Sequence, residues 1–141
     1  MSHDIEALLR SAGAVVEGHF RLTSGRHSPT FIEKFRLLES PRHSETLCRL
    51  IADHFRPLAV ELVAAPTTGG IIVSYEVARQ LGVRGIFAER ANGGRSFGRG
   101  FRVGGGERTL VVDDILTTGG SIHDVLAAVR SAGGQPLGVG V

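Results

Sequence analysis

The sequence is poor in cysteine and lysine, and its apolar residues never form a long run. A single cysteine, Cys48, excludes an intrachain disulfide and favours a reducing compartment. No apolar stretch approaches the roughly 20 residues that a membrane-spanning helix needs, and no secretory leader pattern is present. We therefore expect a cytoplasmic protein without membrane contact. Lys34 is the only lysine among 16 Lys and Arg residues, and no basic run predicts a nucleic-acid surface.

The remaining composition is that of an ordinary globular protein, with 42% hydrophobic and 21% charged residues. A length of 141 residues suits one domain with a real core, and no internal repeat indicates a second domain. The formal net charge of +2 suits a small polyanionic ligand. We expect a single domain over residues 1–141.

Helical patterns alternate with short apolar runs, which predicts an α/β fold with a central, mostly parallel sheet flanked by helices. The expected strands begin at Leu62, Val83, Leu110 and Leu137. The expected helices cover residues 4–12, 44–55, 71–81 and 121 to about 132.

Two of these helices carry more detailed predictions. Asp4 is expected to cap the first helix. In the helix at 44–55, one buried face is expected to consist of Leu47, Leu50, Ile51 and Phe55. Cys48 lies in that apolar pattern and is predicted to be a buried small hydrophobe.

Residues 18–34 predict a β-hairpin. Phe20 and Leu22 alternate with polar residues, Ser24 and Gly25 indicate a turn, and an extended run resumes at residues 30–32. By itself this pattern favours a purely structural hairpin.

The most informative stretch is the twelve-residue segment 110–121, which reads LVVDDILTTGGS. A buried strand ends at the acid pair Asp113 and Asp114, and a hydroxyl- and glycine-rich turn leads into an amphipathic helix. Free backbone N–H groups at a helix N-terminus bind phosphate, and carboxylates one sugar away accept hydrogen bonds from ribose hydroxyls. The alternative is that these acids only cap the helix.

A second segment repeats this order. The strand at 62–65 runs into Pro66, Thr67, Thr68, Gly69 and Gly70, and a helix follows. The two segments together suit a ligand with anionic groups at both ends.

Residues 89–102 hold four glycines and four arginines but no Lys or His. Such a stretch is expected to be mobile when no ligand is bound. The alternative is a solvated hairpin tip in which residues 99–101 begin the returning strand.

The segment 110–121 resembles the phosphoribosyl diphosphate (PRPP) signature of the type I phosphoribosyltransferases. The pattern Phe-x-Leu-x-Ser-Gly-x-x-Ser, from Phe20 to Ser28, is similar to the amino-terminal hood of orotate phosphoribosyltransferases. The resemblance implies the type I phosphoribosyltransferase fold, with a small β hood at about 18–36 and a PRPP-binding core at about 44–141. It also implies that the family's carboxyl-terminal segment is absent from this chain.

The activity implied is the transfer of phosphoribosyl from PRPP to orotate, which gives orotidine 5′-phosphate and pyrophosphate in pyrimidine biosynthesis. The resemblance further implies a homodimer and Mg²⁺ held mainly by PRPP and water, with no direct protein ligand. Asp113, Asp114 and Arg90 are the implied catalytic residues.

The resemblance also assigns the binding residues. Those for PRPP are Thr67, Thr68, Gly69, Gly70, Arg90, Asp113, Asp114, Ile115, Leu116, Thr117, Thr118, Gly119, Gly120 and Ser121. Those for orotate are Thr117, Phe31, Ile32 and Thr23, where Thr23 stands at the place of a Lys that contacts the base in many members. Two alternatives stay open: a phosphoribosyltransferase for another base, and a PRPP-binding regulatory module without catalysis.

Overall fold

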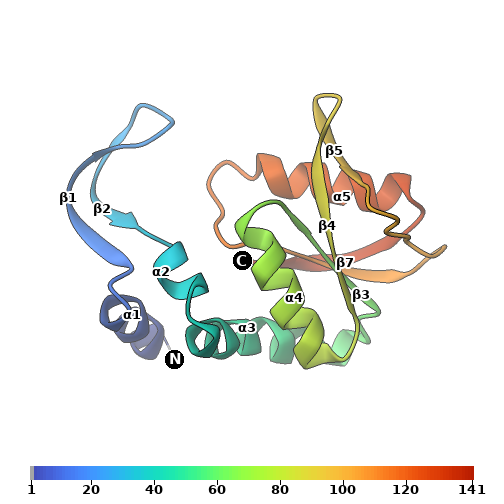
Figure 1. The fold of residues 1–141 in the computed structure, drawn as a ribbon, viewed down its shortest axis with the longest axis horizontal. Coiled ribbons are helices and arrows are strands. Elements are labelled where there is room, and N and C mark those ends of the chain that lie inside the picture. The colour runs from blue at the N-terminus through green and yellow to red at the C-terminus, as the bar shows by residue number, and fades with distance from the viewer. Residues whose placement is uncertain (1) are drawn as a thin grey trace. The chain divides into compact units, whose positions relative to one another are not determined.

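The computed structural model describes the backbone of residues 2–141 and the side chains of residues 4–141. Contacts divide the chain into two compact units, one ending at Ser44 and the other beginning at Glu45 (Figure 1). The prediction that residues 1–141 act as one domain stays a prediction. None of the helices within residues 2–141 combines the length and apolar character needed to cross a bilayer.

The first unit is built around the predicted hairpin. Its elements are α1 (Ser2–Ser11), β1 (Val15–Arg21), β2 (His27–Ile32), α2 (Phe35–Leu38) and the start of α3 (Pro41–Phe55). Strands β1 and β2 pair antiparallel, which confirms the hairpin. The Leu22 N–H donates to the Arg26 carbonyl at 2.7 Å and closes the turn, where Gly25 adopts a φ of 84°.

The predicted capping role of Asp4 is wrong. Helix α1 begins at Ser2, so Asp4 lies within its first turn. A carboxylate there still interacts favourably with the positive end of the helix dipole, which explains why the residue resembled a cap.

The second unit is a five-stranded sheet with helices on both faces. It contains the rest of α3, a short 3₁₀ helix (Arg56–Leu58), and helices α4 (Gly69–Leu81) and α5 (Gly120–Ser131). The strands are β3 (Leu62–Pro66), β4 (Arg84–Ala91), β5 (Gly94–Phe97), β6 (Arg108–Val112) and β7 (Gln135–Gly140). Their order is β5-β4-β3-β6-β7, and every pair except β4–β5 is parallel. The predicted α/β, mostly parallel sheet is confirmed.

Alternate residues of the central strands face different helices, as the period of a strand requires. On one face, Leu62, Ala64 and Val111 pack in a cluster with Ile122, Val125 and Val129 of α5. On the other face, glycines bring the helices close. A Cβ on Gly85 would lie 2.9 Å from the Ser74 carbonyl of α4, and one on Gly138 would lie 2.7 Å from Phe55 of α3. Figure 1 shows α5 on one side of the sheet and α4 on the other.

Helix α3 is longer than predicted, and one of the four residues expected on its buried face lies outside. It begins at Pro41, and Leu50, expected inside, is 39% exposed. Cys48 is buried, as predicted, together with Ser44 and Ala52. These three residues follow one another at a spacing of four, and their small side chains let the helix approach its neighbours closely.

The glycine- and arginine-rich segment forms a hairpin rather than an open loop. Strands β4 and β5 pair from Ala88–Phe97 to Ala91–Gly94, and the turn residues Asn92 and Gly93 both have positive φ. A two-residue turn of this kind suits the twist of paired strands. The returning strand is therefore Gly94–Phe97, and the alternative that placed its start at residues 99–101 is wrong.

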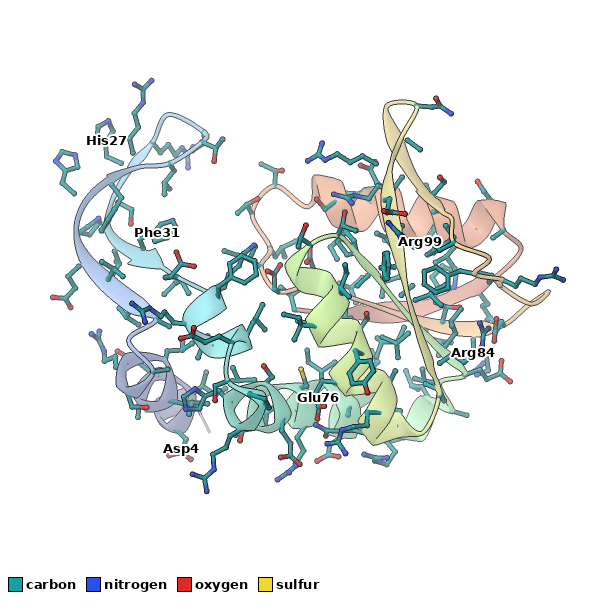
Figure 2. The ribbon with its side chains drawn as sticks, in the orientation of Figure 1. Asp4, His27, Phe31, Glu76, Arg84 and Arg99 are labelled. Carbon is teal, nitrogen blue, oxygen red and sulfur yellow. The ribbon has the colours of Figure 1, made fainter. Side chains whose placement is uncertain are left out.

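Helices α3 and α4 are joined by polar contacts around the buried Cys48. Glu76 of α4 accepts from Arg79 at 2.8 Å and from Gln80 at 2.7 Å, and Gln80 also donates to the Glu45 carbonyl of α3 (Figure 2). The Arg79 hydrogen bond lowers the pKa of Glu76, so this carboxylate stays charged. Burial, with a smaller effect from the Glu76 charge, raises the pKa of the Cys48 thiol to about 12.

We expect Cys48 to be unreactive in the folded protein. A thiol reagent at pH 8 should label it only after unfolding in urea, because the thiolate is the nucleophile. The unfolded thiol ionises near pH 8.5, whereas the folded thiol keeps its proton to about pH 12. The unfolded state then binds fewer protons, so Cys48 should lower the free energy of unfolding as pH rises through that range. Urea titrations against Cys48→Ala measure this contribution, and equal pH slopes for the two proteins would contradict it.

Candidate functional site

The predicted anion-binding segments follow two neighbouring parallel strands. Strand β3 ends at Pro66 and leads through Thr67 and Thr68, joined by a cis peptide bond, into α4. Strand β6 ends at Val112 and leads through residues 113–119 into α5. Because β3 and β6 pair in parallel, both segments leave the same edge of the sheet. The connection through α4 runs to one side and that through α5 to the other, which is the place where open α/β sheets bind ligands.

The acid pair lies directly against the N-terminus of α4. A Cβ on Gly69 would lie 2.7 Å from Asp114 Cγ, and one on Gly70 would lie 3.2 Å from Asp113 Oδ1. Asp113 is only 7% exposed, and its Oδ1 accepts the Asp114 N–H at 2.8 Å. The structure therefore brings Asp113 and Asp114 together with the first residues of α4, and only glycine leaves room for this approach.

The segment after the acid pair is open to solvent. Residues 115–118 are exposed, including 56% of Leu116. Gly119 caps α5 with a φ of 85°, and no side chain donates or accepts a capping hydrogen bond there. The N–H groups of the first turn, which includes Gly120 and Ser121, thus lie at the positive end of a helix, and the Thr118 hydroxyl lies close to Gly120, an arrangement suited to phosphate.

A side chain from the β4–β5 hairpin reaches the first segment. Arg95 Nη1 donates to Thr67 Oγ1 at 3.0 Å and to the Ala88 carbonyl at 3.1 Å. From the sequence alone, Arg95 is only one of several arginines in residues 89–102. Its position could have been predicted from the two-residue turn at Asn92 and Gly93, which sets Arg95 opposite Arg90 in register.

The other hairpin arginines lie differently. Arg90 is exposed, and its side chain makes no hydrogen bond or ion pair within the part of the chain described. Arg99 is held by Glu89 at 2.8 and 3.0 Å and lies over the Phe87 ring (Figure 2). That hydrogen bonding lowers the pKa of Glu89. Arg99 is thus engaged by a carboxylate, whereas Arg90 and Arg95 share one face of the hairpin.

Three of the residues assigned to the base lie in the first unit. Thr23 is exposed in the hairpin turn, Phe31 is 41% exposed, and Ile32 is 38% exposed. The Phe31 ring centre lies 5.6 Å from that of Phe20, so the two aromatic side chains form a partly exposed apolar surface on the hairpin. Thr117 belongs to the second unit and lies three residues after Asp114 in the chain.

The donor set at the sheet edge is made of hard oxygens. Carboxylates of Asp113 and Asp114 and hydroxyls of the two threonine pairs are ligands that Mg²⁺ accepts. Within residues 4–141, no group of three or more His, Cys, Asp or Glu side chains could hold a metal ion on its own.

Comparisons with known proteins agree on one family. The family model described as phosphoribosyl transferase domain matches residues 37–141. The orotate phosphoribosyltransferase of Pelotomaculum thermopropionicum is 52% identical over 98% of this chain and 73% of its own length. That of Desulforamulus reducens is 46% identical over 98% of this chain and 72% of its own. The crystal structure of orotate phosphoribosyltransferase from Aeropyrum pernix superposes with a TM-score of 0.79 at 26% identity, and covers 96% of this chain and 78% of that one.

Substitution of Gly69 at the start of α4 tests the close approach of the Asp114 carboxylate to this helix. In Gly69→Ala, the added methyl group must displace the Asp114 carboxylate, so the free energy of unfolding should fall by about 1–3 kcal/mol despite the better helix propensity of alanine. Gly105→Ala is the matched control, because a Cβ there meets no heavy atom within 4 Å. Urea unfolding of both variants measures the difference, and an equal effect of the two changes would contradict the close approach.

Proposed function

Because the chain belongs to the orotate phosphoribosyltransferase family, we propose that it transfers the phosphoribosyl group of PRPP to orotate. The products are orotidine 5′-phosphate and pyrophosphate, a step of pyrimidine biosynthesis. The observation that carries the proposal is the position of Asp113 and Asp114 against Gly69 and Gly70, which joins two anion-binding segments at one sheet edge.

The two segments suit the two ends of PRPP. We assign the 5′-phosphate to the turn at residues 117–121, where free N–H groups, hydroxyls and the helix dipole favour an anion. We assign the diphosphate to residues 67–70, at the N-terminus of α4, with Arg90 of the strand that pairs with β3 as a cation. Asp113 and Asp114 lie between these segments in the fold, where their carboxylates can accept hydrogen bonds from the ribose hydroxyls.

The reaction breaks the bond from ribose C1 to the diphosphate oxygen, which leaves with the electron pair, and forms a bond from C1 to a ring nitrogen of orotate. Glycosyl transfer passes through a cation-like sugar, so the carboxylates of Asp113 and Asp114 favour the positive charge that develops on the ring. In orotate the negative charge lies on the carboxylate and the attacking ring nitrogen carries a proton, so this proton leaves to the departing diphosphate or to water as the new bond forms. The chain's main contributions are to orient the sugar and to neutralise the leaving group.

Mg²⁺ fits this site as a partner of the substrate. When bound, it would neutralise part of the diphosphate charge. Asp113 and Asp114 would meet its shell through water, while the substrate supplies the other oxygens.

We further propose that Phe31, Ile32 and Thr23 meet the base, and that the protein is a cytoplasmic homodimer. The partly exposed aromatic surface of the hairpin supports the first proposal, because a flat pyrimidine stacks well on such a surface. The family resemblance supports the second.

The proposed role of the acid pair predicts the effect of one substitution. Asp114→Asn should keep the fold but lower kcat/KM for PRPP by about 10- to 100-fold, since hydrogen bonds to a charged group contribute roughly 1.5–3 kcal/mol. The assay mixes protein, PRPP, Mg²⁺ and orotate and follows the loss of orotate absorbance. Asp53→Asn is the control, because Asp53 makes an exposed ion pair with Arg56 on α3. Unchanged kinetics in Asp114→Asn would refute the assignment.

A further inference from the structure

Arg95 is tied to the segment that we assign to the diphosphate. Its Nη1 donates to Thr67 Oγ1 and to the Ala88 carbonyl, at 3.0 and 3.1 Å. The same carbonyl accepts the Thr67 N–H at 3.2 Å. One carbonyl of β4 thus anchors both Thr67 and the guanidinium, and Arg95 holds the Thr67 hydroxyl in a fixed place.

These two contacts use a single nitrogen of the guanidinium. Within residues 4–141, Nε and Nη2 of Arg95 donate to no acceptor, and the guanidinium forms no ion pair with a carboxylate. The half-buried guanidinium therefore keeps a positive charge and several N–H donors next to Thr67.

Two neighbouring arginines differ from Arg95 because each is paired with a carboxylate of the protein. Arg99 is paired with Glu89 at 2.8 Å, and Arg84 is paired with Glu107 at 3.0 Å. Their charges are compensated by carboxylates of the protein. Arg95 is the hairpin arginine that contacts the anion-binding segment while its own charge has no protein counterion in the described residues.

We propose that Arg95 binds the diphosphate, in addition to Arg90, and is the positioning residue for Thr67. This inference rests on the proposed function, and it assigns a cation in a segment, residues 89–102, that contains no lysine. Arginine stays charged at any ordinary pH and binds phosphate oxygens through two N–H groups at once. Nη1 holds Thr67, while Nε and Nη2 bind the diphosphate. They stabilise the negative charge that develops on the diphosphate as the bond to C1 breaks.

The test uses Arg95→Gln and the control Arg102→Gln. Arg102 lies on the same connection between β4 and β6, and its exposed side chain makes no hydrogen bond or ion pair within residues 4–141, so its variant loses the same charge without the same contacts. Calorimetry measures the Kd of two ligands, pyrophosphate with Mg²⁺ and ribose 5-phosphate, for each protein. We expect Arg95→Gln to weaken pyrophosphate binding by about 10- to 100-fold and to leave ribose 5-phosphate binding unchanged. Arg102→Gln should change both by less than about twofold.

The positioning role needs its own measurement, because loss of charge alone would also weaken pyrophosphate binding. Thr67→Val removes the hydroxyl that Arg95 holds. If Arg95 acts partly through that hydroxyl, the double variant should lose less affinity than the product of the two single losses. Strictly multiplicative losses would overturn the positioning role.

The outcomes separate this inference from the proposed function. If the unaltered protein binds neither ligand, the proposed function fails. If it binds both, and Arg95→Gln binds pyrophosphate equally well, only the role of Arg95 fails.

If Arg95→Gln does not fold, Arg95→Lys takes its place. Its single nitrogen cannot both hold Thr67 and bind the diphosphate in the same way, so we expect about a 3- to 30-fold loss for pyrophosphate alone. Unchanged pyrophosphate affinity in that variant would overturn the inference.

Discussion

The candidate site depends on the close approach of two carboxylates to a helix that begins with two glycines. Asp113 and Asp114 end the β6 connection, and Gly69 and Gly70 begin α4. Any side chain on Gly69 would occupy the space of the Asp114 carboxylate. The parallel pairing of β3 with β6 sets the distance between the acid pair and the start of α4, so the sheet, the helix start and the acid pair form one structural unit.

That arrangement explains how one short edge of a sheet can accept a ligand that is anionic at both ends. Negative carboxylates would repel phosphates if they stood alone. Here they lie at the positive end of α4, and the open N-terminus of α5 and the guanidinium of Arg95 add further positive potential nearby. The acid pair can therefore accept hydrogen bonds from the hydroxyls of a sugar that lies between two phosphate-binding segments.

The buried strands and the shared edge were predictable from the sequence. Runs such as residues 62–65 and 110–112 are apolar throughout, and parallel strands place their carboxyl ends together. The contacts of Arg95 with Thr67 and of Asp114 with Gly69 were not predictable, because they depend on distances between elements that are remote in the chain. The exposure of Leu50 was not predictable for a different reason: Leu50 stands at the rim of the predicted apolar face, and the small buried residues Ser44, Cys48 and Ala52 decide where the centre of that face lies.

Strand β5 lies at one edge of the sheet and has only four residues. An unpaired edge can recruit a strand from another molecule and start aggregation, and short strands that carry charged side chains resist this. Arg95 supplies such a charge, and the pairing extends only from the turn to Ala88 and Phe97. The hairpin that brings a cation to Thr67 therefore also protects the sheet against growth at that edge.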